Sequence, residues 1–489
     1  MTDDTLILVL DAGTTSTRAM LFAPDGAIHG VCQRELTQFY PQAGWVEHDA
    51  AEIWSATLAC AQQMVAKAGA RIAAIGITNQ RETVVAWDKT SGQPLHHALV
   101  WQDRRTAPAC AALRTAGQEP VVQAATGLLL DPYFSATKMH WLIANVPAVG
   151  AAADAGTLAL GTVESWLVWN LTGGAHLSDA SNASRTSLLP LAGATWDPGL
   201  CDVFGVPRAA LPEVVDNAGN FGTTLAAVLG AALPICGLVG DQQSATIGQG
   251  CLAPGETKAT YGTGAFVLAN MGSDVPRSGH RLLGTVLCQL GGKRTYALEG
   301  SVFVAGSLIK WLRDGLGMIE QAGETAALAA SVMDSGGVVV VPALSGLGAP
   351  HWKPEARGSI SGLSFATTRA HIARASLEAM AQQTFDLAAA FTADGACWTT
   401  LRIDGGMSAN DWMAQDLADI LALPVERPAS VETTALGAAM LAGVGAGLFG
   451  SLEGAAEAMR GSVRTFLPAM AEDVRAARLG AWAKALACV

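Results

Sequence analysis

The sequence lacks the signatures of a disulfide-rich, zinc-binding or nucleic-acid-binding protein. Its nine cysteines are scattered and none belongs to a CxxC pair, which disfavours a zinc site and suits a reducing compartment with free thiols. Charged residues make up only 15% of the 489 residues, the net charge is −12, and no basic stripe is present. Because nucleic-acid binding needs clustered positive charge, we expect no nucleic-acid partner.

The sequence also lacks a convincing membrane-spanning run. Two uncharged segments, 217–240 and 433–452, are long enough to raise the question. Glycines and Pro234 interrupt the first, which favours loops and strands, while the second is mostly Ala, Gly and Thr, which favours a tightly packed buried helix. The first residues carry acids where a signal peptide needs basic residues. We therefore expect a cytoplasmic protein with no stable membrane insertion.

What the sequence does contain is a repeated strand–turn–strand device. In residues 8–22, LVLDAGTTSTRAMLF, an apolar run ends at Asp11, a glycine turn carries four hydroxyl residues, and a second apolar run follows. Residues 256–270, ETKATYGTGAFVLAN, repeat it with a turn at 262–264. Half of the residues are hydrophobic, which favours a globular enzyme. The repeat suggests two α/β domains, which we place at residues 1–247 and 248–489.

Hydrophobic spacing predicts helices and further strands around these devices. The predicted helices cover residues 49–66, 107–116, 136–144, 302–313, 371–391, 411–421 and 432–441. Predicted strands cover residues 71–80 and 82–88, and a turn at residues 24–26 extends the first device into a longer hairpin. Strands that alternate with helices are typical of layered α/β folds.

The two glycine turns could bind phosphate. Glycine lets a backbone approach an anion, and the hydroxyls of Thr14, Thr15 and Ser16 add donors while Arg18 adds positive charge. A carboxylate at a strand end, such as Asp11, can hold Mg²⁺ through water. A purely structural turn explains either segment equally well on its own. Two such turns from two domains favour a clamp on a triphosphate.

Further polar residues stand where predicted strands end, each with a structural alternative. Asp241 follows an apolar strand and is suited to act as a general base, or else it is a helix N-cap. Arg81 and Glu82 are adjacent, so both reach one ligand only if the chain leaves the strand there, and a surface ion pair is the alternative. Tyr133 is a site residue or a core residue, and Gly405-Gly406 before a helix is a nucleotide site or a plain turn.

Taken together, these stretches resemble the FGGY family of carbohydrate kinases. Residues 133–142 (YFSATKMHWL) and 358–378 (GSISGLSFATTRAHIARASLE) match its two signatures, and the resemblance covers nearly the whole chain. It implies an α/β fold of two actin-like, ribonuclease-H-like ATPase domains with an active-site cleft between them. It also implies that the chain uses ATP and Mg²⁺.

The pattern is most similar to family members that phosphorylate glycerol at a terminal hydroxyl, giving sn-glycerol 3-phosphate. The resemblance implies polyol contacts from Arg81, Glu82, Tyr133, Asp241, Gln242, Trp101 and Phe266. It implies nucleotide contacts from Thr14, Thr15, Ser16, Arg18, Thr263, Gly306, Lys310, Gly406 and Asn410. Asp241 would be the catalytic base, and Asp11 with Asp241 would hold Mg²⁺, largely through water.

Two other activities remain open from the sequence. One is phosphorylation of another small polyol or ketose, such as a tetritol, a pentitol or a pentulose. The other is an actin-like ATP switch, which would not need the polyol residues. We expect a homodimer or a homotetramer.

The sequence departs from those glycerol-phosphorylating relatives at three places. Ala12 and Lys310 each stand where glutamine is usual, which affects the first turn and one nucleotide contact. Residues 226–233, AAVLGAAL, lack the Gly/Arg pattern that binds fructose 1,6-bisphosphate in some bacterial members. We therefore predict no inhibition by this bisphosphate, and an assay across millimolar concentrations that showed clear inhibition would refute the prediction.

Overall fold

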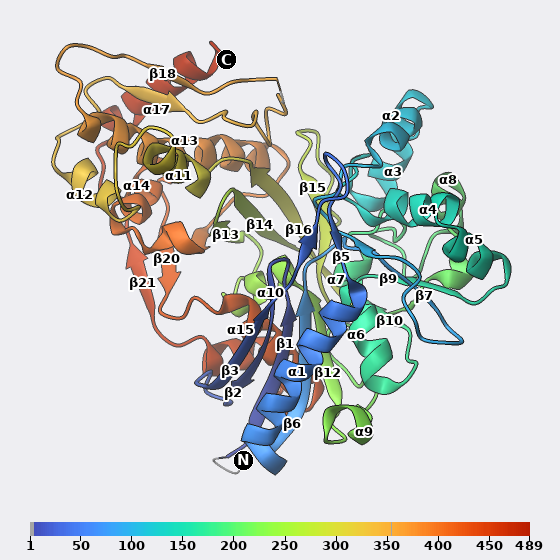
Figure 1. Cartoon of the computed structure of the whole chain (residues 1–489). Helices are drawn as coiled ribbons and strands as arrows, with labels where there is room; N and C mark the ends of the chain where they lie inside the picture. The colour runs from blue at the N-terminus through green and yellow to red at the C-terminus, as the bar shows by residue number, and fades with distance from the viewer. Residues whose placement is uncertain (1–3, 354) are drawn as a thin grey trace.

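The structure is a computed structural model that describes residues 4–353 and 355–489, and it is built around two β-sheets (Figure 1). The first sheet has the strand order β12-β6-β1-β2-β3 and the second has the order β15-β16-β14-β13-β19-β20-β21. Helices cover both sheets, so the α/β prediction is confirmed.

The first sheet brings three strand ends to one edge. It consists of β1 (Leu6–Ala12), β2 (Ser16–Phe22), β3 (Ile28–Glu35), β6 (Ile72–Asn79) and β12 (Ile235–Gly240). β1 and β2 form the predicted antiparallel hairpin, in which Asp11 lies opposite Arg18. β6 pairs in parallel with both β1 and β12, with Asn79 opposite Ala12 and opposite Gly240. Chain segments that follow these strands therefore emerge side by side.

The second sheet repeats this arrangement around β13. Its strands are β13 (Glu256–Tyr261), β14 (Ala265–Gly272), β15 (Leu283–Leu290), β16 (Lys293–Val302), β19 (Thr400–Asp404), β20 (Val425–Pro428) and β21 (Val463–Phe466). β13 pairs antiparallel with β14 across the second glycine turn and parallel with β19. Both predicted strand–turn–strand devices are therefore present.

Smaller sheets and helices complete the chain. The short strands are β4 (Gln38–Phe39), β5 (Glu47–His48), β7 (Val85–Asp88), β8 (Ala98–Leu99), β9 (Leu158–Gly161), β10 (Leu177–Asp179), β11 (Glu213–Val215), β17 (Val339–Val341) and β18 (Ser359–Ser361). The helices are α1 (Ala50–Ala68), α2 (Ala107–Thr115), α3 (Glu119–Thr126), α4 (Ser135–Asn145), α5 (Pro147–Asp154), α6 (Val163–Thr172), α7 (Ala180–Ala183), α8 (Pro198–Phe204), α9 (Ala226–Leu229), α10 (Asp241–Gly248), α11 (Gly306–Asp314), α12 (Glu324–Ala330), α13 (Arg369–Ala393), α14 (Asp411–Leu421), α15 (Thr433–Gly445), α16 (Leu452–Met459) and α17 (Glu472–Leu486).

The prediction of a helix over residues 302–313 is partly wrong. Val302 ends β16, where it pairs with Ala265 of β14, and α11 begins only at Gly306. The Ala305 amide donates to the Thr263 carbonyl oxygen at 2.9 Å, which ties the chain to the second turn. Sheet pairing with a distant strand overrides the local helical spacing here.

Helix α15 joins the two halves of the chain. Its sequence lies after the second sheet's β20, yet its buried residues form one hydrophobic cluster with Ile7 and Val9 of β1. It packs against α10 so closely that a β-carbon on Gly437 would lie 1.9 Å from the Ser244 carbonyl oxygen. The buried helix expected within 433–452 is therefore present, and the division at residue 247 stays a prediction.

This close approach predicts a stability effect. Gly437→Ala should lower the free energy of unfolding by about 1–3 kcal/mol, because the added methyl group forces α10 and α15 apart. Gly480 of α17 is the matched control, since a β-carbon there would meet nothing within 4 Å. Gly480→Ala should raise the free energy of unfolding by about 0.5–1 kcal/mol. Urea denaturation of both variants tests this, and equal effects at the two positions would contradict the packing argument.

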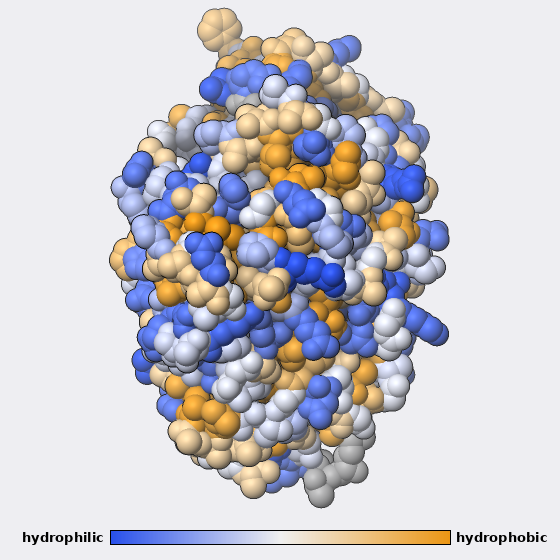
Figure 2. Space-filling view, turned by 90° about the vertical axis from the view of Figure 1, so that its right-hand side faces the viewer, coloured by the Kyte–Doolittle hydropathy of each residue, from blue (hydrophilic) through white to orange (hydrophobic). Residues whose placement is uncertain are grey.

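The surface is mixed in character. On the face that carries α2, α5 and α8, hydrophilic and hydrophobic residues are interspersed (Figure 2). Within residues 4–353 and 355–489, no helix is both long and apolar enough to span a bilayer.

Candidate active site

The first glycine turn lies at the edge where β1 ends. The Gly13 amide donates to the Ser16 carbonyl oxygen at 3.0 Å, which closes the turn. Trp101 donates from Nε1 to Thr14 Oγ1 at 2.9 Å, so the indole lies against this turn. The predicted phosphate turn and one predicted polyol residue are therefore adjacent.

Arg18, a predicted nucleotide contact, forms two ion pairs within the chain. Its Nη2 lies 2.5 Å from Asp11 Oδ2, and its Nη1 lies 2.6 Å from Glu432 Oε2. Burial raises the pKa of Asp11, and Arg18 opposes that effect. Both carboxylates pair with the guanidinium, so Arg18 orients Asp11, and its contact with a nucleotide phosphate stays a prediction. Sequence spacing gave no sign of Glu432, which comes from the segment before α15.

Asp241 begins α10 directly after β12. Its side chain is 30% exposed, and its Oδ1 lies 3.4 Å from Arg81 Nε. Gly240 is the N-cap residue of α10, and Asp241 Oδ1 accepts from the Gln242 amide at 2.7 Å. Burial raises the pKa of Asp241 to about 6, against the opposing effect of Arg81. A partly exposed carboxylate with this pKa is suited to accept a proton near neutral pH.

Arg81 and Glu82 point into the same centre because the chain leaves the strand before them. β6 ends at Asn79, and Glu82 has a φ of 61°, in the left-handed region that non-glycine residues rarely adopt. Their side chains are only 2% and 1% exposed, so the alternative of a surface ion pair is wrong. Such backbone strain is typical of functional sites.

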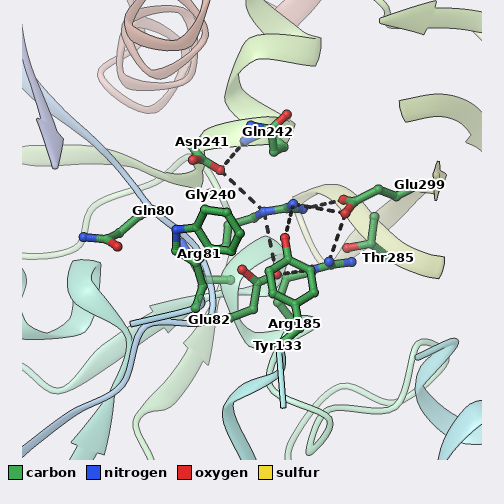
Figure 3. A network of polar contacts seen from close by, with 12 residues as sticks. Gln80, Arg81, Glu82, Tyr133, Arg185, Gly240, Asp241, Gln242, Thr285 and Glu299 are labelled. Atoms are coloured by element: carbon green, nitrogen blue, oxygen red, sulfur yellow. Dashed lines mark hydrogen bonds and ion pairs between the residues drawn. The ribbon is translucent and has the colours of Figure 1, made fainter. Parts of the chain in front are cut away.

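A buried charge network holds these two residues (Figure 3). Arg81 Nη1 lies 2.7 Å from Glu299 Oε2, and Arg185 bridges Glu82 at 2.6 Å and Glu299 at 3.1 Å. Burial would raise the pKa of Glu299, but Arg185 and Arg81 outweigh it and lower that pKa to about 2. Glu299 belongs to β16 of the second sheet, so the network links the two sheets.

Aromatic rings line the same centre. Tyr133 accepts from Arg81 Nη2 at 3.3 Å, and burial raises its pKa. Trp101 packs edge-on to Tyr133 with ring centroids 5.7 Å apart. Phe266 lies on β14 opposite Ser301, beside the second turn. The structure thus brings Arg81, Glu82, Tyr133, Trp101 and Asp241 together.

The predicted nucleotide residues of the second half form their own cluster. The Gly306 amide donates to the Gly262 carbonyl oxygen at 2.8 Å, and a β-carbon on Gly306 would lie 2.6 Å from that oxygen. Gly406 opens a short 3₁₀ helix over Gly406–Ala409, and Asn410 caps α14 by accepting from the Met413 amide at 3.1 Å. Lys310 is exposed on α11. Gly306 thus packs against the second turn, whereas a β-carbon on Gly406 would meet nothing within 4 Å, which leaves open space for a ligand before the N-terminus of α14.

The residues fit a Mg²⁺ ion that is held mainly by water and phosphate. Residues 4–353 and 355–489 contain no group of three or more His, Cys, Asp and Glu residues suited to hold a metal on its own. Mg²⁺ in phosphate sites commonly needs only one or two carboxylates, because it keeps several waters. Asp11 lies near the end of β1 and Asp241 directly follows β12 of the same sheet, so these two residues would supply the carboxylates.

Comparisons with known proteins identify this arrangement. The model of the FGGY family of carbohydrate kinases, N-terminal domain, matches residues 6–248, and that of the C-terminal domain matches residues 257–446. The chain is 54% identical to a glycerol kinase of Rhodospirillum centenum over 98% of this chain and 97% of the relative. It is also 54% identical to a glycerol kinase of Alcanivorax borkumensis over 99% and 98%.

A solved structure agrees with this similarity. The crystal structure of Plasmodium falciparum glycerol kinase with ADP superimposes with a TM-score of 0.95 at 36% identity, covering 99% of this chain and 97% of that one. The fold and the sequence comparisons lead to the same assignment. The chain belongs to the FGGY family of carbohydrate kinases.

Proposed function

We propose that the chain transfers the γ-phosphoryl group of ATP to a terminal hydroxyl of glycerol, giving sn-glycerol 3-phosphate. One observation carries the proposal: a carboxylate with a raised pKa, Asp241, lies beside a buried polar set of Arg81, Glu82 and Tyr133 at the edge where the phosphate turn lies. The similarity to glycerol kinases over nearly the whole chain supports the same activity. The Plasmodium falciparum glycerol kinase was crystallised with ADP, which supports ATP as the donor for this chain.

The polar set suits a small polyol. Charged groups that are fixed by a buried network bind hydroxyls in one geometry and reject ligands that leave them unpaired. Arg81 and Glu82 offer a donor and an acceptor, and the Trp101 and Tyr133 rings offer a wall for the carbon side. This combination favours a short chain of carbons with a hydroxyl on each.

The proposed chemistry depends on positioning and electrostatics. Asp241 accepts the proton of the attacking hydroxyl, while Thr14, Thr15, Ser16 and Thr263 bind the oxygens of the phosphate chain from the two turns. When bound, Mg²⁺ would neutralise charge on the β- and γ-phosphates, with Asp11 and Asp241 as its carboxylates. Closure of the two predicted domains around the substrates would exclude water and limit hydrolysis of ATP.

A substrate panel tests the proposal. Purified protein with ATP and Mg²⁺ would be assayed on glycerol, erythritol, a pentitol and a pentulose. The proposal predicts that glycerol has the highest kcat/KM. A higher kcat/KM for erythritol or the pentulose would overturn the substrate assignment, and ATP hydrolysis unaffected by any polyol would favour an ATP switch.

The pKa of Asp241 predicts a pH dependence. Because only the ionised carboxylate accepts a proton and the pKa is about 6, the active form is lost as the pH falls through 6. We expect kcat/KM for glycerol to fall about tenfold per pH unit below that value and to level off above it. Rates measured at constant ionic strength check this. An acid limb centred near the ordinary aspartate pKa of about 4 would contradict it.

A further inference from the structure

Lys258 is a buried cation that reaches from the second sheet to the proposed polyol site. It lies on β13, its side chain is fully buried, and its Nζ donates to Gln242 Oε1 at 2.6 Å. Gln242 follows Asp241 at the start of α10 (Figure 3). The contact therefore joins β13, the strand before the second glycine turn, to α10, the helix that begins with the proposed base.

The chemistry of the pair fixes the orientation of the amide. An ammonium group has three donors and no acceptor, so the Gln242 atom beside it has to be the oxygen. Burial lowers the pKa of Lys258, while the carboxylates of Asp404 and Asp241 favour its charged form. The flipped amide would bring an NH₂ group against the ammonium and lose a charge-assisted hydrogen bond.

The amide nitrogen is then the end of Gln242 left for a ligand. Oε1 is taken by Lys258, and Gln242 is only partly buried. The Gln242 carbonyl oxygen is also occupied, because it accepts from Thr246 Oγ1 at 2.8 Å. Nε2 is a donor and requires an oxygen acceptor on the substrate.

We propose that Lys258 is a positioning residue that locks the Gln242 amide so that Nε2 donates a hydrogen bond to a hydroxyl oxygen of the substrate. The inference rests on the proposed function, since Gln242 belongs to the proposed polyol set. It assigns a role to Lys258 in substrate binding, through Gln242 and not through the reacting atoms. It also makes the subsite selective for an oxygen that can accept a hydrogen bond.

A double-mutant cycle tests the proposal. Lys258→Met keeps the length of the side chain and removes the donor, and it should raise the KM for glycerol about tenfold with a smaller change in kcat and an unchanged KM for ATP. Gln242→Ala should have a similar effect. Lys258→Met combined with Gln242→Ala should be no worse than Gln242→Ala alone, because the lysine acts only through the amide. Lys258→Arg keeps a donor and should restore the KM to within about threefold of the wild type.

Other outcomes overturn the inference. If the KM increases of the two single variants multiply in the double variant, Lys258 does not act through Gln242. If Lys258→Met lowers kcat and ATP affinity together, Lys258 has a merely structural or general electrostatic role. If Lys258→Met does not fold, Gln242→Glu decides the question, since it keeps the acceptor for Lys258 and removes the Nε2 donor. An unchanged glycerol Kd in Gln242→Glu, measured by calorimetry, would overturn the proposal.

The proposed function can fail separately. If the wild-type protein prefers another polyol of the panel, the cycle is measured with that polyol and the Lys258 proposal stands or falls on the same criteria. If the wild-type protein neither binds nor phosphorylates any polyol, both proposals are wrong. If the wild-type protein phosphorylates glycerol but the KM effects of the two substitutions multiply in the double variant, only the role of Lys258 is refuted.

Discussion

Asp241→Asn should lower kcat for glycerol about 10²–10⁴-fold while the substrate still binds. The size of the effect is that of a lost general base. Asparagine has nearly the same shape and keeps an oxygen that can accept from the Gln242 amide, so the start of α10 should be preserved. It no longer accepts a proton, and this is the property that the raised pKa of Asp241 provides.

Steady-state kinetics and a calorimetric Kd for glycerol check this prediction. The matched control is Asp314→Asn, the same change at a carboxylate that is 48% exposed at the end of α11. The control should keep wild-type kcat. Near-wild-type turnover in Asp241→Asn would remove the role of this residue as the base.

Glu299→Gln should lower the free energy of unfolding by about 3–5 kcal/mol. Glu299 lies between Arg81 and Arg185, and all three side chains are buried. Removal of one member of a buried ion pair leaves an uncompensated charge in a low-dielectric interior, which accounts for an effect of this size. Glutamine keeps the shape of the side chain but not its charge.

The same substitution should also raise the KM for glycerol, because Arg81 loses the partner that fixes it. Urea denaturation measures the stability change as a shift in the midpoint urea concentration, provided that the m-value, the slope of the unfolding free energy against urea concentration, stays constant. Asp314→Asn again serves as the control and should leave the midpoint unchanged, since its pair with Arg313 is exposed. A Glu299→Gln variant as stable as the wild type would show that the network does not depend on this charge.

Much of the fold follows from local patterns. The two hairpins, the helices over Ala50–Ala68 and Asp411–Leu421, and the buried α15 were all predictable from apolar runs, glycine turns and helical spacing. The end of β16 was not, because Val302 is held in a strand by Ala265, a partner outside the local window. Local spacing cannot report such a pairing.

The site was predictable only in part, for a similar reason. Arg81, Glu82 and Asp241 stand at strand ends, and strand ends are visible in a sequence. Glu299 is separated from Arg81 by 218 positions. The sequence around Glu299 contains no motif that indicates an ion-pair partner. A single charged residue in the otherwise uncharged stretch TYALEGSV was the one available signal, since charged residues are rarely buried without a partner.

Arg18 has two ion-pair partners, and one of them comes from a distant part of the sequence. Its position in the first glycine turn predicts a phosphate contact, and in the structure Asp11 and Glu432 both pair with its guanidinium. The partner Glu432 lies 414 positions away, so the sequence spacing could not reveal this ion pair.

The most direct test of the proposed chemistry is a crystal structure with glycerol and a non-hydrolysable ATP analogue bound. We predict a terminal glycerol oxygen about 3 Å from the Asp241 carboxylate and facing the γ-phosphate, which lies between the turns at Ser16 and Thr263. A closed complex in which every glycerol oxygen lies beyond hydrogen-bond reach of Asp241 would contradict it.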